Sequence, residues 1–268
     1  MKKVLSSVLA LVLLVSVVMV FASCAKEDGK ATLVCGVTDF DPMNFKDADG
    51  NWTGFDTEFA QLVGEKLGME VKFQQIEWAQ KYNELTAGTI NCIWNGFTAN
   101  TNEEDGTARK DLVDFSYSYM LNQQCIVVKA ANKGAYTSPE SLVGRNVAVE
   151  GGSAGDSYAT EQIGDGKIID AASQISTLPE VKSGAADCAV IDVLLAKSMT
   201  GKGDYADLTI ADVELPSEVY AIGFAKGSDL TAKVNNAIKE LDAEGKLAEL
   251  AAKYGLENSY KLDTAFAG

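Results

Sequence analysis

Polar residues follow two short apolar runs in this chain, and they are the side chains best placed to do chemistry. Asn95 and Gly96 come directly after the run at residues 90–94, and Asp192 comes directly after the run at 188–191. In open parallel sheets, ligands bind at the carboxyl ends of the strands. We therefore expect these residues to line a binding cleft. A carboxylate there is costly unless it is paired, and the alternative role of Asp192 is to cap the helix that follows.

The two segments that contain these runs resemble each other. Residues 84–97 and 180–193 carry Glu, Gly and Cys at the same offsets, and in each a helix-like stretch leads through the glycine into the apolar run. A short match of this kind can also arise by chance. If it reflects structure, the chain holds two similar α/β units with facing strand ends, which predicts a cleft between two lobes.

Composition excludes several classes of function. The 268 residues include 23 basic and 38 acidic side chains, and the formal charge of -15 disfavours nucleic acid and anionic membrane surfaces as partners. The chain has no histidine, which excludes Ser-His and Cys-His catalysis and histidine-bound metals. No CxxC spacing occurs either. We expect no metal and no cofactor.

The N-terminus has the pattern of an export signal. Two lysines precede the apolar run at 4–21, and the small residues Ala22 and Ser23 lead to Cys24. This pattern indicates a signal peptide over residues 1–23; a single membrane-spanning anchor is the alternative. The ending resembles the lipobox of bacterial lipoproteins. That resemblance implies a lipid on Cys24, a tether over 24–31 and a protein anchored at the outer face of the cell membrane or in the periplasm.

Four further cysteines remain in the exported part of the chain: Cys35, Cys92, Cys125 and Cys188. An even number in an exported protein is compatible with disulfides. Each of them, however, lies inside an apolar strand-like run, where cysteine is common as a small buried residue. We expect free thiols.

Hydrophobic periodicity and turn residues divide the rest of the chain into two units. In the first we expect strands at 32–37, 70–75 and 90–94 and helices at 56–67 and 78–85. In the second we expect strands at 146–149, 167–170 and 188–191 and helices at 156–163, 175–182 and 193–199. The strands 125–128 and 220–224 are expected to cross between the units, before helices at 230–241 and 246–254 return to the first. The predicted lobes are 32–124 with 222–268, and 125–221.

Several motifs resemble one known family. They are GFD at 54–56, an arginine at 109 followed by VDFS at 113–116, and LVGRNVAV at 142–149, supported by residues 184–192 and 242–254. Together they resemble the extracytoplasmic amino-acid-binding proteins of ABC importers, solute-binding protein family 3, over about residues 32–254. The resemblance implies an α/β, type II periplasmic-binding-protein-like fold, with two α/β lobes joined by two hinge strands and a free amino acid between them.

An amino acid needs a cation for its carboxylate and an anion for its ammonium. The resemblance places Arg109 at the carboxylate, where a guanidinium can form two parallel hydrogen bonds, and Asp192 at the ammonium. Backbone amides at Ser153 and Ala154, at the start of an expected helix, would complete the carboxylate site. A solvated arginine and a plain glycine turn are the structural alternatives. A short insertion at 102–106 leaves the reach of Arg109 open.

Further ligand-binding positions follow from the resemblance alone. They are the aromatic residues Phe40, Trp78 and Trp94 and the polar stretch Asn95, Gly96 and Thr98. Core packing is the alternative for the aromatic residues, above all for Trp94. The sequence shows no clear carboxylate cluster for lysine or arginine, so we expect a ligand with a polar side chain of modest size.

The resemblance implies a monomeric receptor that delivers its amino acid to an ABC transporter permease. An enzyme of the dehydratase type on the same fold is the main alternative, with Asp192, Glu77 and Glu150 as the candidate titratable groups. A ligand-sensing module of a signalling receptor is another. The sequence shows no second membrane segment or cytoplasmic domain, which disfavours the sensing module.

Overall fold

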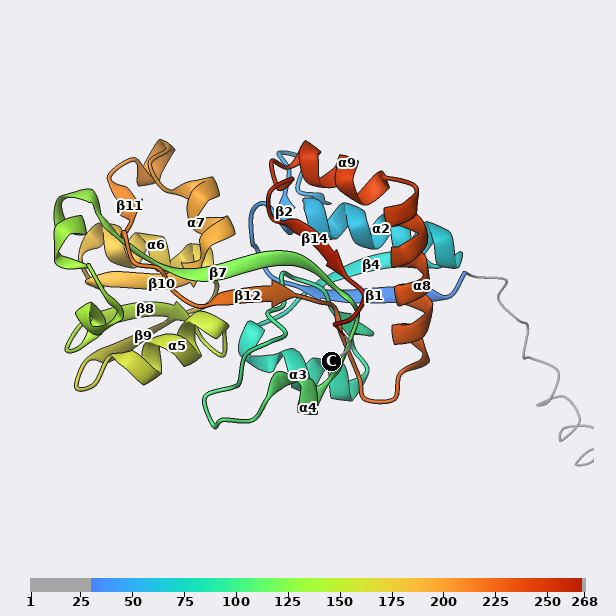
Figure 1. Cartoon of the computed structure of the whole chain (residues 1–268), viewed down its shortest axis with the longest axis horizontal. Coiled ribbons are helices and arrows are strands. Elements are labelled where there is room, and N and C mark those ends of the chain that lie inside the picture. The colour runs from blue at the N-terminus through green and yellow to red at the C-terminus, as the bar shows by residue number, and fades with distance from the viewer. Residues whose placement is uncertain (1–29, 267–268) are drawn as a thin grey trace, which may run out of the picture. The chain divides into compact units, whose positions relative to one another are not determined.

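Two β-sheets form the framework of the structure, a computed structural model that describes residues 30–266 (Figure 1). The expected signal peptide, the lipidation site at Cys24 and most of the tether lie outside the described residues. Within the described range, no helix combines the length and the apolar character needed to cross a membrane.

The first sheet is built mainly from the N-terminal third of the chain. Its strand order is β4 (Glu70–Gln75), β1 (Thr32–Val37), β5 (Cys92–Ile93), β13 (Gly223–Phe224) and β6 (Asp114–Phe115). β1 pairs in parallel with both β4 and β5, which is the predicted β-α-β-α-β arrangement. β13 joins it from near the end of the chain and runs antiparallel to β5.

Helices from both ends of the chain cover this sheet. They are α2 (Phe55–Leu67), α3 (Lys81–Ala87), α4 (Arg109–Leu112), α8 (Asp229–Ala243) and α9 (Lys246–Lys253), with a 3-10 helix at Trp78–Gln80 and a small hairpin of β2 (Phe45–Lys46) and β3 (Trp52–Thr53). The apolar face of α2 buries Phe55, Phe59 and Val63, and α8 and α9 pack against the same helix. We call the first sheet with these helices the first lobe.

The second sheet carries the predicted strands of the second unit. Its order is β11 (Leu208–Ile210), β7 (Ser118–Lys129), β10 (Cys188–Asp192), β8 (Asn146–Glu150) and β9 (Lys167–Ala171). The helices that accompany it are α5 (Ala154–Gln162), α6 (Gln174–Ser183) and α7 (Val193–Met199), with 3-10 helices at Ala130–Ala135, Pro139–Leu142 and Gly203–Tyr205. β8, β9 and β10 pair in parallel, so their carboxyl ends meet at one edge. This is the second lobe.

β7 is the element that connects the two lobes. Its first half pairs with β12 (Ser217–Tyr220) and β14 (Tyr260–Asp263), and its second half pairs with β10 and β11 in the second sheet. Figure 1 shows β7 and β12 running side by side between the two groups of elements. The paired segments are 120–123 and 217–220, so the expected crossing strand at 125–128 lies inside the second sheet instead. The expected strand at 220–224 is divided into β12 and β13.

The resemblance between the two strand–loop segments has a structural counterpart. Helix α3 ends at Gly88 and helix α6 ends at Gly184, and both glycines adopt the left-handed conformation, with φ of 74° and 86°. β5 follows in the first case and β10 in the second. The four cysteines are buried and free, as predicted; Cys35 Sγ and Cys92 Sγ lie 3.6 Å apart.

Candidate ligand-binding site

Arg109 begins α4, and only 1% of its surface is exposed. Its guanidinium donates from Nη1 to the Thr98 carbonyl at 3.1 Å and from Nη2 to the Gly152 carbonyl at 3.3 Å. Nε lies 2.8 Å from Glu103 Oε1, an ion pair whose geometry does not meet that of a hydrogen bond. Thr98 and Gly152 belong to different lobes, so Arg109 connects them. The alternative of a solvated surface arginine is wrong.

Lys81 is a second buried cation, which sequence reasoning missed. Its Nζ donates to the Gly152 carbonyl at 2.9 Å and lies 3.6 Å from Glu103 Oε2. Burial and then the charge of Arg109 lower the pKa of Lys81 to about 8. Glu103 lies in the loop at 102–106 and also accepts from Tyr82 Oη at 2.6 Å. This loop therefore supplies the carboxylate that balances one of two buried cations.

Asp192 ends β10 and faces Arg109 from the other lobe. Its carboxylate accepts from the side chains of Asn122 and Gln174, from Gln124 Nε2 at 3.0 Å and from Tyr220 Oη at 2.8 Å. Burial raises its pKa, although these hydrogen bonds oppose the shift. Within the described residues, its side chain makes no hydrogen bond that caps α7, so the capping alternative is wrong.

Two further carboxyl groups accompany Asp192. Glu218 Oε2 accepts from Asn122 Nδ2 at 2.9 Å and from Gln124 Nε2 at 3.0 Å, two of the three amides that also donate to Asp192. It accepts in addition from Thr98 Oγ1 at 3.1 Å. Burial, then the charge of Asp192, raises the pKa of Glu218 to about 7 and that of Glu150, at the end of β8, to about 8. Asp192, Glu218 and Glu150 thus form a buried group of carboxyl side chains that sequence reasoning did not bring together.

The start of α5 uses its own side chains for capping. Ser153 Oγ accepts from the Asp156 amide at 3.0 Å, and Asp156 Oδ2 accepts from the Gly152 amide at 2.8 Å. Ala154 is 7% exposed. The Ser153 hydroxyl thus stabilises the helix start, and Ser153 and Ala154 both line the cavity described next.

One small cavity joins most of the predicted site residues. It is lined by Trp78, Asn95, Gly96, Thr98, Arg109, Glu150, Ser153, Ala154, Gln174 and Asp192. Its free volume is about 10 Å³, room for a single water molecule. An amino acid is far larger, so the two lobes have to separate before one can enter.

Phe40 and Trp94 are not among the described residues that line this cavity. Trp94 packs edge-on against Phe59, with ring centroids 5.1 Å apart, so the core-packing alternative is right for it. The Phe40 ring packs against Gly96, because a Cβ added at Gly96 would lie 2.6 Å from Phe40 Cε1. The Asn95 side chain links its loop to the segment that follows β1, because its Oδ1 accepts from the Thr38 amide at 2.9 Å.

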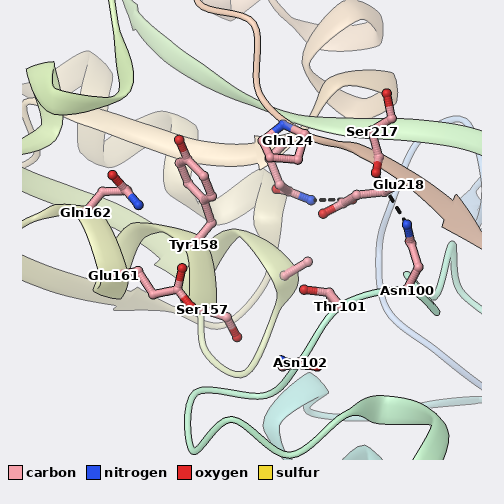
Figure 2. A pocket seen from close by; sticks show the side chains of 12 residues that line it. Asn100, Thr101, Asn102, Gln124, Ser157, Tyr158, Glu161, Gln162, Ser217 and Glu218 are labelled. Carbon is pink, nitrogen blue, oxygen red and sulfur yellow. Dashed lines mark hydrogen bonds between the residues drawn. The ribbon is translucent and has the colours of Figure 1, made fainter.

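Beside this cavity lies a wider polar pocket of about 430 Å³ (Figure 2). Tyr158 and Glu161 of α5 form one wall, and Asn100 lies on the opposite side (Figure 2). Gln124 and Glu218 also line it and are hydrogen-bonded to each other at 3.0 Å, and Ala154 lines both spaces. We call it the α5 pocket.

Comparison with known sequences identifies the family. The family of bacterial extracellular solute-binding proteins, family 3, matches residues 33–257. The chain belongs to this family. Among curated relatives, the arginine-binding extracellular protein ArtP of Bacillus subtilis is 30% identical over 91% of this chain and 96% of its own. The L-cystine-binding protein TcyJ of Escherichia coli is 25% identical over 84% of this chain and 83% of its own.

A solved relative has the same fold. The substrate-binding protein of an ABC uptake transporter from Streptococcus pneumoniae, solved with bound histidine, superposes with a TM-score of 0.75 at 31% identity, over 86% of this chain and 95% of that one. This family 3 solute-binding protein thus has the predicted type II periplasmic-binding-protein-like fold. These named relatives are binding proteins of transporters and not enzymes, so the dehydratase alternative is not supported.

Proposed function

We propose that this solute-binding protein binds a free amino acid with a polar side chain between its two lobes and delivers it to the permease of an ABC importer. The observation that carries the proposal is the opposition of Arg109 and Asp192, both buried, across one cavity. A cation and an anion so placed complement the two charges of an amino acid. The names of the arginine-, cystine- and histidine-binding relatives support the same class of ligand.

Each charged group of the ligand has a partner in this proposal. Arg109 would bind the carboxylate through the N–H groups that Thr98 and Gly152 leave unused, with help from the amides of Ser153 and Ala154. Asp192 would bind the ammonium, and Trp78 would form one wall beside the side chain. The amide-rich surroundings of Asp192 fix the position of its carboxylate before the ammonium binds.

Ligand binding would favour the closed arrangement of the lobes. We place the boundaries at 124/125 and 221/222, close to the paired strands β7 and β12 that act as hinges. A ligand held by Arg109 on one lobe and Asp192 on the other shifts the population toward the closed form. That form would dock on the permease. A lipid on Cys24 would hold the monomeric receptor at the outer face of the membrane.

A thermal-shift screen of the purified protein against the twenty amino acids and cystine tests the proposal. A ligand at a hundredfold excess over its Kd raises stability by about 2.7 kcal/mol, so at least one amino acid should raise the Tm clearly. Arg109→Ala and Asp192→Ala should each abolish the shift. Glu161→Gln, in the α5 pocket, should leave it unchanged. A screen without any shift, or one indifferent to both site substitutions, would refute the proposed site.

A further inference from the structure

A second pocket adjoins the binding cavity and shares no lining residue with the α5 pocket. Its volume is about 440 Å³, and Trp78 and Glu150 line both this pocket and the small cavity. Glu77, beside Trp78, and Asp170, near the end of β9, also line it. The two spaces are therefore neighbours, with Trp78 and Glu150 at the boundary between them. We call the second pocket the side pocket.

The side pocket has a strongly one-sided charge. Three carboxyl groups line it, those of Glu77, Glu150 and Asp170, and its wall contains no lysine or arginine among the described residues. Two cations of the neighbouring cavity, Lys81 and Arg109, act on Glu150, and the Lys81 Nζ lies 5.3 Å from the Trp78 ring. That ammonium is turned toward the Gly152 carbonyl and Glu103. A concave acidic wall concentrates cations and repels anions.

Glu150 supplies an independent indication of a ligand. It is 3% exposed, and its Oε1 has no hydrogen-bond partner among the described residues. A buried polar oxygen without a partner is costly. Because Glu150 stands between the cavity and the side pocket, a ligand that passes from one to the other can donate to this oxygen. The indole of Trp78 offers an apolar surface for methylene groups at the same point.

We propose that the side pocket is the side-chain subsite of the cleft and takes a long side chain that ends in a cation, the amine or guanidinium of a basic amino acid. The inference rests on the proposed function, since it presumes an amino acid held by Arg109 and Asp192. The methylene stem would lie along Trp78, and the cation would bind Glu150 and reach the outer carboxylates Glu77 and Asp170. The proposed subsite thus narrows the expected ligand from an amino acid with a polar side chain to one with a cationic side chain.

Titration calorimetry of the purified protein with L-arginine and L-citrulline tests this subsite. The two ligands have the same length, but citrulline ends in a neutral urea group. Charge-assisted hydrogen bonds contribute enough for arginine to bind about tenfold to a hundredfold more tightly. Glu150→Gln should reduce that ratio toward one, and Glu161→Gln in the α5 pocket should leave it unchanged. Equal affinities in the unmodified protein, or an equal loss for both ligands in Glu150→Gln, would overturn the inference.

A second variant keeps the test decisive if Glu150→Gln does not fold. The double substitution Glu77→Gln and Asp170→Asn changes two exposed side chains. It should weaken arginine binding by about threefold to tenfold at low salt, with a smaller loss at high salt. An unchanged ratio between the affinities for arginine and citrulline would overturn the subsite. If a neutral amino acid binds with the expected dependence on Arg109, only the subsite fails; if no amino acid binds, the proposed function fails with it.

Discussion

Two groups of buried ionisable side chains face each other across the cleft. Lys81, Arg109 and Glu103 form a cluster with one excess positive charge. Glu150, Asp192 and Glu218 form an acidic one. Burying such groups opposes folding unless they are paired. In the proposed function they complement the two charges of an amino acid, so we expect ligand binding to offset part of this cost.

Only part of this arrangement was predictable from sequence. Asp192 could be found because it follows a fully apolar strand, and Arg109 because of its place in the family motif. Lys81 lies on a helix whose pattern is typical of a solvated face. Glu218 contacts Thr98 across 120 positions, a pairing that no local pattern encodes. Sequence reasoning therefore missed Lys81 and Glu218, which reach the site only through tertiary contacts.

The acidic group predicts how stability depends on pH. Burial raises the pKa of Glu218 from 4.5 to about 7, so the folded protein binds this proton more tightly than the unfolded chain does. The resulting stabilisation is complete below the unfolded pKa and is lost as the pH rises through about 7. Without added ligand, the unfolding free energy should fall between pH 5 and 8.5. Glu218 accounts for up to about 3 kcal/mol of this fall.

Urea denaturation at several pH values measures this dependence. Glu218→Gln carries no titrating proton, so its unfolding free energy should change less over the same range. Glu214→Gln, at an exposed position, is the matched control and should follow the unmodified protein. Parallel pH profiles for Glu218→Gln and the unmodified protein would show that Glu218 titrates normally.

Glu103 should stabilise the basic group. Its side chain is 16% exposed and pairs with both Arg109 and Lys81. Glu103→Gln leaves two buried cations without a counter-charge, which should lower the unfolding free energy by about 3 kcal/mol. Guanidinium screens charge, so urea is the suitable denaturant. Asp105→Asn, at an exposed position of the same loop, controls for changes to the loop. Equal midpoints for the two variants would contradict a specific role for Glu103.

At the scale of elements, most helices and strands follow from local patterns. The strand at Glu70–Gln75 and the helix at Val193–Met199 have the expected bounds, because apolar periodicity and flanking turn residues agree there. β7 was only partly predicted. Its centre carries Asn122 and Gln124, polar residues that interrupt the apolar pattern yet serve the buried carboxylates. These two polar residues therefore hide the apolar pattern by which the strand could have been predicted.

The packing of α5 against β10 depends on a glycine. A Cβ at Gly155 would lie 2.5 Å from the Val190 carbonyl oxygen, a backbone atom that cannot easily move. Gly155→Ala should therefore destabilise the protein by about 1–3 kcal/mol and weaken ligand binding, since it displaces the helix start at Ser153. Gly134→Ala, where nothing lies within 4 Å of the added Cβ, is the control. Equal unfolding midpoints for the two variants would show that α5 shifts freely.

At the scale of the whole molecule, the contacts between lobes set the balance between open and closed forms. The cavity of about 10 Å³ requires opening for ligand entry, and β7 with β12 provides two strands about which the lobes can turn. Lys81 and Arg109 of the first lobe both donate to the Gly152 carbonyl of the second. These bonds favour closure independently of the ligand.

Lys81→Met isolates this contribution. Methionine keeps the length of the side chain and leaves Glu103 and Arg109 as a balanced pair, so folding should be little affected. The closed form loses a hydrogen bond from a charged group, and the affinity for the amino acid should fall about tenfold. Small-angle X-ray scattering without ligand should give a larger radius of gyration than for Lys72→Met, an exposed lysine of the same lobe. With saturating ligand the two variants should converge, because ligand contacts to both lobes then dominate. If the two variants instead match in both affinity and radius, Lys81 does not influence closure, and the bond from Arg109 to the Gly152 carbonyl is the contact to test next.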